Sequence, residues 1–315
     1  MKAVTRSLLR DGSYAPCAMN FLEQIPDAAL FSKSHKLRHP SSIYRLSLDK
    51  VADAFCRVAE EYLSKTQENR EHSSALLKMD QLLRDQVSLL RAFQEHFDEL
   101  WMILKTFVDP ASAKKSTEFN DRYVIESKLP GAKSFQRAIA DCKSNLRIAN
   151  KLKHQQCYLR GVAVWSYSGV HLGYCLEEPD DQGQLGPSPD IHPDHGAFSF
   201  ARDLTWRLAE LYLCSDDLVE TIKGVLKSRN VSLKTQINQG NGKWDKAISL
   251  ACRIPPAIFP KELKKPSAGF SLDCDSQLLS IKIPVHLTVN FPQPMKARYA
   301  TVLDGHTTTH RVPRP

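Results

Sequence analysis

Apolar residues recur at alternating three- and four-residue spacings through the middle of the chain, which predicts long amphipathic helices. The clearest repeat covers residues 73–108 and is interrupted only by Gln86. At 3.6 residues per turn it forms a continuous seam of about ten turns. Bulky aromatic members and the presence of other helices favour a bundle helix over a free coiled coil. The seam consists of Leu76, Met79, Leu83, Leu90, Phe93, Phe97, Leu100, Leu104 and Phe107.

Three further segments have the same helical period and are predicted as helices: residues 46–64, 130–154 and 199–227. Pro130 suits the first turn of the second of these, because that position needs no backbone N–H. Together with residues 73–108, these segments predict a four-helix bundle.

The period changes after the third predicted helix. Two β-prone runs in "CYLRGVAVWSYSGVHLGYCLEE" predict a β-hairpin at 157–176 that turns at Ser168-Gly169. A loop rich in Pro, Gly and Asp follows over residues 179–196. The hairpin aromatics are expected to pack against the bundle, with base stacking as the alternative; they are Tyr158, Trp165, Tyr167 and Tyr174.

The two ends of the chain differ from its middle. Within residues 229–315, "GFSLDCDSQLLSIKIPVHLTVNF" predicts strands because Leu279, Ile281, Ile283 and Val285 alternate, and the many prolines of this region disfavour long helices. The expected fold is therefore mainly α, a four-helix bundle with an inserted β-hairpin followed by a smaller β-rich region. The expected domains are an irregular N-terminal arm at 1–43, the bundle at 44–228, and the β-rich region at 229–315 with a frayed tail.

Net charge, cysteine spacing and the lengths of the apolar runs indicate the class of protein but do not identify a partner. The chain has 315 residues and a formal net charge of +8, which permits a nucleic-acid partner but does not require one. Its eight cysteines include no CxxC pair, which is typical of reduced thiols in the cytoplasm. No apolar run has the length of a signal peptide or a transmembrane helix, so we expect a soluble cytoplasmic protein without a membrane partner.

The stretch "LRIANKLKH" contains the clearest candidate chemistry. Arg147, Asn150 and His154 are separated by three and four residues, so they project from one side of a helix. This polar line is offset by about one residue from the apolar line ending at Ala149, and we expect it to border the core. The predicted catalytic residues are Arg147, Asn150 and His154, and the predicted nucleic-acid contacts are Lys143, Lys151, Lys153 and Arg160.

Arg-x6-His on a late bundle helix resembles the HEPN superfamily, the "higher eukaryotes and prokaryotes nucleotide-binding" helical domains. The family signature is an arginine, four to six residues, then a histidine, and "NKLKH" is similar to many of its sequences. The resemblance covers about residues 46–227. It implies that the protein binds RNA or cleaves it without a metal ion, and that it needs no cofactor. Members of the family often belong to bacterial toxin or antiviral defence systems. Active members pair so that both motifs face one RNA strand, which implies a homodimer.

The chemistry of that motif follows from its residue types. RNA supplies its own nucleophile, the 2′-OH, and histidine is the side chain that exchanges protons near neutral pH. A forked, permanently charged guanidinium stabilises negative charge at phosphorus. The sequence departs from active members at Ile148, where they commonly have a polar residue. The alternative is that His154 and its basic neighbours are a solvated helix end.

Other patterns are weaker. Asp190, His192, Asp194 and His195 share one loop, where a polar surface is favoured over a metal site because no Cys pair or helical HExxH accompanies them. No phosphate-binding or nucleophile motif is present. The alternative function is a non-enzymatic interaction or scaffold subunit that holds a partner protein through the seam at 76–107 and the C-terminal β-rich region.

Overall fold

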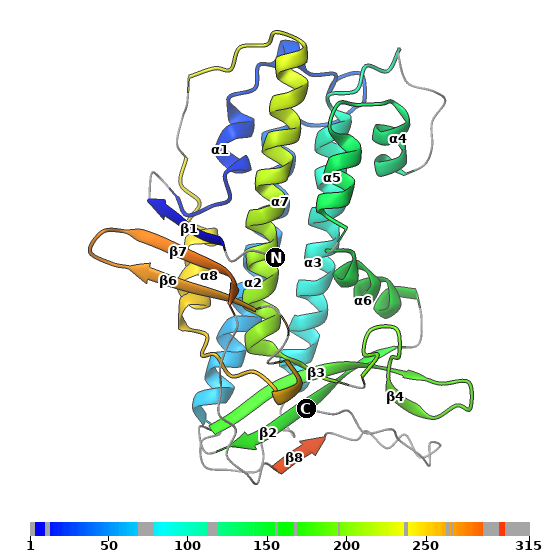
Figure 1. Ribbon diagram of the computed structural model, residues 1–315, viewed down its shortest axis with the longest axis vertical. Coiled ribbons are helices and arrows are strands. Elements are labelled where there is room, and N and C mark those ends of the chain that lie inside the picture. Colours follow the sequence, from blue (N-terminus) through cyan, green and yellow to red (C-terminus); the bar gives the residue numbers. More distant parts are fainter. Residues whose placement is uncertain are drawn as a thin grey trace.

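Three long helices lie along the long axis of the molecule (Figure 1). They are α2 (Pro40–Glu68), α3 (Asp80–Lys105) and α7 (Phe200–Ser228), and α2 packs against both of the others. This computed structural model describes residues 4–9, 13–68, 79–111, 119–140, 142–154, 157–166, 169–194, 196–235, 239–262, 265, 267–285 and 296–299.

Shorter helices surround these three. α6 and α4 pack on α3, α5 packs on α7, and α8 packs on α2. In the described segments, no helix has the length and hydropathy needed to cross a membrane. The bounds are α1 (Ala18–Glu23), α4 (Asn120–Glu126), α5 (Ala132–Ala138), α6 (Lys143–His154) and α8 (Gly242–Arg253), with 3-10 turns at Asp27–Ala29 and Pro260–Glu262.

Two small antiparallel sheets complete the fold, and both join distant parts of the chain. The larger has the order β4-β3-β2-β8, with β5 also paired to β3, and crosses the lower end of the long helices (Figure 1). The smaller has the order β1-β7-β6 and lies beside α7 and α8. The strands are β1 (Val4–Leu9), β2 (Tyr158–Ser166), β3 (Gly169–Pro179), β4 (Leu185–Pro187), β5 (Phe198–Ser199), β6 (Ser267–Asp273), β7 (Leu278–Val285) and β8 (Lys296–Tyr299).

The apolar seam of α3 is internal. Leu90, Phe93, Phe97 and Leu104 are almost completely buried, and α2 packs along α3. A bundle helix is therefore confirmed over the described part of this segment, while Leu76 lies outside the described residues. The described seam residues are thus covered within the fold, and the use of this seam by a partner stays a prediction.

The hairpin and the fourth predicted helix are confirmed, but the single helix at 130–154 is wrong. β2 pairs antiparallel with β3 from Tyr158↔Glu177 to Ser166↔Gly169, and α7 matches the helix predicted at 199–227. The chain instead turns between α5 and α6, where Cys142 N–H donates to the Ile139 carbonyl at 3.1 Å. α5 packs on α7 whereas α6 packs on α3 and the larger sheet, so one straight helix would not serve both contacts.

The described residues near the two ends of the chain form more regular structure than predicted, and the tail expected to fray, residues 304–315, lies outside the described residues. β1 pairs with β7 in register from Val4↔Ile283 to Leu9↔Leu278, so the N-terminal segment completes a C-terminal sheet. α1 also lies within the arm expected to be irregular, and α2 begins at Pro40. A strand pair near the C-terminus is confirmed in β6 and β7, but α8 was not predicted.

Candidate functional site

α6 presents its polar stripe to solvent. Ile148 and Ala149 are buried against Leu90 of α3 and Leu176 of β3, and Leu152 packs beside them. Arg147 is 59% exposed, and Asn150 and His154 are exposed on the opposite side. The prediction that this polar line borders the core is wrong. Ile148, Ala149 and Leu152 form the inward face of α6, and the polar line lies on the opposite face.

One edge of the stripe faces α3. Gln94 Nε2 donates to Asn150 Oδ1 at 2.6 Å, which fixes the amide of Asn150 across the two helices. Lys153 is exposed and lies near Asp98. Burial, with nearby Asp121 adding to it, raises the pKa of Asp98, and the charge of Lys153 opposes that rise. Asn150 is thus a positioned polar group, while Lys153 remains on the surface.

The other edge is held by acidic residues. Lys151 Nζ lies 2.6 Å from Glu178 Oε2 and 3.3 Å from Asp190 Oδ2, and its side chain is only 14% exposed. Burial alone would lower the pKa of Lys151, but Glu178 and Asp190 raise it. Arg147 Nη2 approaches the same Asp190 Oδ2 at 3.8 Å, with both side chains more than half exposed. Lys151 is therefore committed to internal ion pairs, whereas the Arg147 pair is a weak surface contact.

The structure does not bring Arg160 onto this surface. Arg160 is buried on β2 and forms an ion pair with Glu177 of β3. Because successive strand residues point to opposite faces, Arg160 and Glu177 lie on the face opposite Glu178, which contacts α6. Tyr158 shares the Arg160 face and is 70% exposed, so the expectation that it packs in the core is wrong. Lys143 belongs to α6, but its side chain lies outside the described set.

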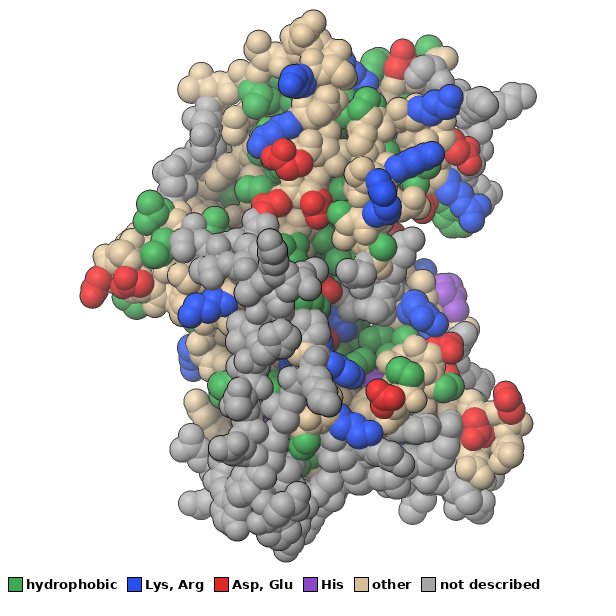
Figure 2. Space-filling view, viewed as in Figure 1, with side chains coloured by type: hydrophobic (Ala, Val, Ile, Leu, Met, Phe, Trp, Pro, Cys, Tyr) green, Lys and Arg blue, Asp and Glu red, His purple; other side chains and the backbone are tan. Residues whose placement is uncertain are grey.

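Charges on this side of the molecule are mixed. Figure 2 shows Lys and Arg side chains interspersed with Asp and Glu in the region of α4 to α6. Two hollows of about 520 and 630 Å³ are lined by residues between 27 and 50 and by Glu99 and Met102, and none of these belongs to α6. The α6 stripe is therefore an open strip and not the lining of either hollow.

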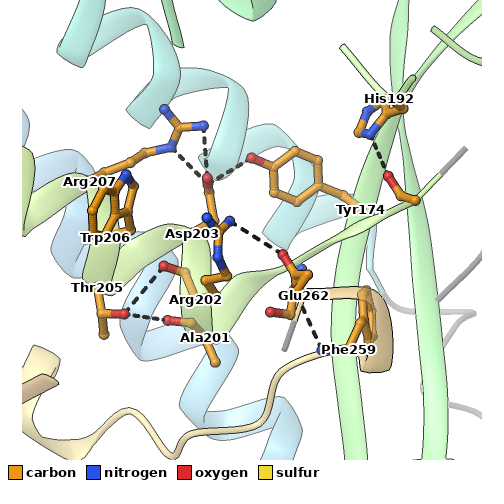
Figure 3. Close-up of polar contacts among 12 residues, drawn as sticks. Tyr174, His192, Ala201, Arg202, Asp203, Thr205, Trp206, Arg207, Phe259 and Glu262 are labelled. Carbon is orange, nitrogen blue, oxygen red and sulfur yellow. Dashed lines mark hydrogen bonds and ion pairs between the residues drawn. The ribbon is translucent and has the colours of Figure 1, made fainter. Parts of the chain in front are cut away.

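A buried polar network lies where α3, β3 and α7 meet, and the sequence pattern did not predict it as a unit. Asp203 Oδ2 accepts from Gln86 Nε2 at 2.8 Å. It also accepts from the Tyr174 hydroxyl at 2.7 Å and from Arg207 Nε at 2.9 Å (Figure 3). All four side chains are buried. Burial raises the pKa of Tyr174, so its hydroxyl stays protonated and donates. The one available signal was Gln86, the polar residue that interrupts the apolar seam.

A second buried carboxylate anchors the segment that follows α8. Glu262 Oε2 accepts from Ser199 N–H at 3.0 Å and from Phe259 N–H at 3.2 Å, and Arg202 Nη1 lies 3.5 Å from Glu262 Oε1 (Figure 3). Ser199 is the residue before α7, so the carboxylate lies at the positive end of that helix. This contact fixes the start of α7 against the chain at 259–262 and is structural.

The histidine loop is also structural where it is described. His192 is 2% exposed, and its Nε2 accepts from Leu176 N–H at 2.9 Å. Its Nδ1 lies 2.6 Å from the Gly196 carbonyl, which requires a proton on Nδ1. The ring is thus a neutral bridge between β3 and the loop, and Asp190 pairs with α6 instead. Among the described residues, no group of three or more His, Cys, Asp or Glu side chains is placed to hold a metal ion; His195 lies outside them.

Comparisons with known proteins identify no relative. No family model matches the chain, and neither a curated protein nor a solved structure matches it. Any assignment of function therefore rests on the geometry of α6 and its surroundings.

Proposed function

We propose that the exposed face of α6 binds single-stranded RNA and, in a pair of protomers, cleaves it without a metal ion, as in HEPN-like proteins. The observation that carries the proposal is the alignment of Arg147, Asn150 and His154 on one solvent-facing line of α6. In this proposal α2, α3, the α5–α6 segment and α7 correspond to the four helices of the HEPN-like bundle.

The surroundings of α6 refine the set of residues. Lys151 and Arg160 hold acidic partners inside the protein, so we assign them to positioning rather than to phosphate contact. Arg147 and Lys153 remain as exposed cations for the RNA backbone. The Arg147–Asp190 contact is long and exposed, and a phosphate would displace it at little cost in free energy.

The line along α6 also supports pairing. Seven residues separate Arg147 from His154, which is about 10 Å along the helix axis. One protomer thus presents an open strip rather than a pocket that encloses a phosphate. A second copy related by two-fold symmetry would bring a second strip opposite the first and exclude water from between them.

The proposed reaction uses the RNA itself as nucleophile. His154 removes the proton from the 2′-OH, whose oxygen attacks the adjacent phosphorus. The bond from phosphorus to the 5′-oxygen breaks, and that oxygen takes a proton from the histidine of the second copy. Arg147 stabilises the charge that develops on the phosphoryl oxygens. The products are a 2′,3′-cyclic phosphate and a 5′-hydroxyl.

RNA binding tests the surface separately from the chemistry. We expect fluorescence anisotropy of a labelled single-stranded RNA to show that Arg147→Ala and Lys153→Ala each weaken binding and reduce the salt slope by about one. Lys223→Ala is a matched control, because Lys223 is an exposed cation on α7 that pairs with Glu220. Unchanged affinity and salt slope in Arg147→Ala would overturn the assignment of this face to RNA.

A protein partner is the second candidate for the same face. The mixed charges around α6, in which Asp98 and Asp190 accompany Lys153 and Arg147, favour this alternative. In that case Arg147→Ala would weaken capture of the partner while RNA binding stays absent in the wild-type protein.

A further inference from the structure

Two buried thiols touch at the start of α6. Cys142 lies in the turn between α5 and α6, and Cys214 lies within α7. Their sulfur atoms are 3.4 Å apart, although 72 residues separate them in the chain. Cys142 is 5% exposed and Cys214 is 2% exposed. None of the eight cysteines forms a disulfide in the structure.

A bond between these sulfurs requires them to come closer. A disulfide has a sulfur–sulfur bond of about 2.05 Å, so the two atoms would need to approach by about 1.3 Å from their 3.4 Å separation. Cys214 is held by the helical hydrogen bonds of α7, but Cys142 follows a short turn closed by its N–H bond to the Ile139 carbonyl. Rotation of the two side chains with a small shift of this turn would supply the movement.

We propose that Cys142 and Cys214 form a reversible disulfide in response to hydrogen peroxide or a similar small peroxide, which ties the beginning of α6 to α7. One sulfur, as its thiolate, attacks a peroxide oxygen, which releases water and leaves a sulfenic acid. The second thiol then attacks that sulfur, a second water leaves, and the sulfur–sulfur bond forms. Two thiols and one peroxide thus give one disulfide and two waters. The proposal does not depend on the function proposed above.

Other buried cysteines provide contrast within the same chain. Cys56 and Cys175 are buried like the pair, and burial raises the pKa of Cys56 to about 11 and that of Cys175 to about 12. Neither has a described sulfur neighbour within bonding reach. Because the proposed reaction needs two adjacent thiols, Cys56 and Cys175 should remain thiols after peroxide treatment.

The test counts thiols in the whole folded protein. After peroxide treatment, alkylation in denaturant should label six thiols instead of eight, and a peptide map should show one link, between Cys142 and Cys214. The melting temperature should rise by roughly 3 °C or more, because a long loop is closed, and should return after reduction. Cys142→Ser and Cys214→Ala should both abolish the link, whereas Cys56→Ser should retain it.

Three results would overturn the proposal. Eight labelled thiols after peroxide treatment would show that the pair does not react. A link between any other two cysteines would show that the 3.4 Å contact does not select the bond. A link that forms only after unfolding would show that the native contact is not the reactive state. Because Cys142→Ser and Cys214→Ala remove the link independently, a folding defect in one variant leaves the other as a test.

Discussion

At the residue scale, the interior of this protein depends on a few paired charges. Asp203 and Arg207 are one helical turn apart on α7, with side chains 7% and 3% exposed, and Arg207 Nη2 lies 2.8 Å from Asp203 Oδ1. Tyr174 and Gln86 complete the carboxylate's hydrogen bonds and connect β3 and α3 to α7. A buried pair of this kind is costly to break on one side, because the remaining charge has no compensation.

We therefore expect Asp203→Asn to lower the free energy of unfolding by about 3–5 kcal/mol, since it removes the carboxylate that pairs with the buried Arg207 guanidinium and leaves Glu210 as the acidic neighbour of that cation. Tyr174→Phe removes one donor and should cost about 1 kcal/mol. Urea unfolding followed by circular dichroism measures both. Asp181→Asn, on the exposed loop after β3, is the matched control and should stay within about 0.5 kcal/mol of wild type.

His96 adds a dependence on pH. It is 1% exposed, and Ser47 Oγ lies 2.8 Å from its Nδ1. Burial lowers its pKa to about 3, so the folded protein keeps the ring neutral while the unfolded chain takes up a proton below about 6.5. Stability from this group is full above pH 6.5 and is lost as pH falls toward 3, at about 1.4 kcal/mol per unit.

The measurement is the free energy of unfolding in urea at pH 7 and at pH 5. The decrease from pH 7 to pH 5 should be about 2 kcal/mol smaller for His96→Gln than for wild type. Glutamine keeps a hydrogen-bonding group beside Ser47 but has no titration in this range. Equal losses in the two proteins would mean that His96 does not contribute to the acid sensitivity.

At the element scale, the period of apolar residues predicted the long helices well where one straight helix keeps an apolar face buried from end to end. α3 and α7 follow their apolar repeats because each packs along its length. The segment at 130–154 failed because its two halves have different partners, a tertiary requirement that a continuous apolar repeat does not record. α8 was not predicted because the stretch "NQGNGKWD" has the composition of a turn, whereas Asn241 in it is an N-cap whose side chain accepts from Trp244 N–H at 3.1 Å.

Two glycines in different elements give a paired test. A Cβ at Gly173 of β3 would lie 2.2 Å from the Phe198 carbonyl oxygen and 2.4 Å from the Phe259 ring. Gly173→Ala should therefore lower the free energy of unfolding by more than about 2 kcal/mol, because the backbone neighbour has to move. A Cβ at Gly224 of α7 meets nothing within 4 Å, so Gly224→Ala should raise it by up to about 1 kcal/mol. Equal effects in thermal or urea unfolding would contradict this packing.

The candidate site was predictable from sequence in part. The three-four spacing placed Arg147, Asn150 and His154 on one side of α6, as the structure also does. The sequence could not reveal that Lys151 forms ion pairs with Glu178 and Asp190. Nor could it reveal that Arg160 pairs with Glu177. Strand pairing and loop packing bring these carboxylates to α6 and β2. The pairing of β1 with β7 likewise depends on contacts between the two ends of the chain.

At the scale of the whole molecule, the proposed cleavage requires a second copy of the protein opposite the open strip on α6. We expect size-exclusion chromatography with light scattering to give a dimer at micromolar concentration, because each protomer supplies half of the charged groups around the RNA. A protein that is strictly monomeric under those conditions and still cleaves RNA would contradict the paired site.

Cleavage in EDTA tests the central claim most directly. Wild type and Lys223→Ala should cut single-stranded RNA, leave 2′,3′-cyclic phosphate ends, and spare DNA of the same sequence, which lacks the attacking 2′-OH. His154→Ala and Arg147→Ala, both folded by circular dichroism, should be slower by roughly 10²–10⁴. Absence of cleavage by the wild-type protein, or undiminished cleavage by His154→Ala, would contradict the account.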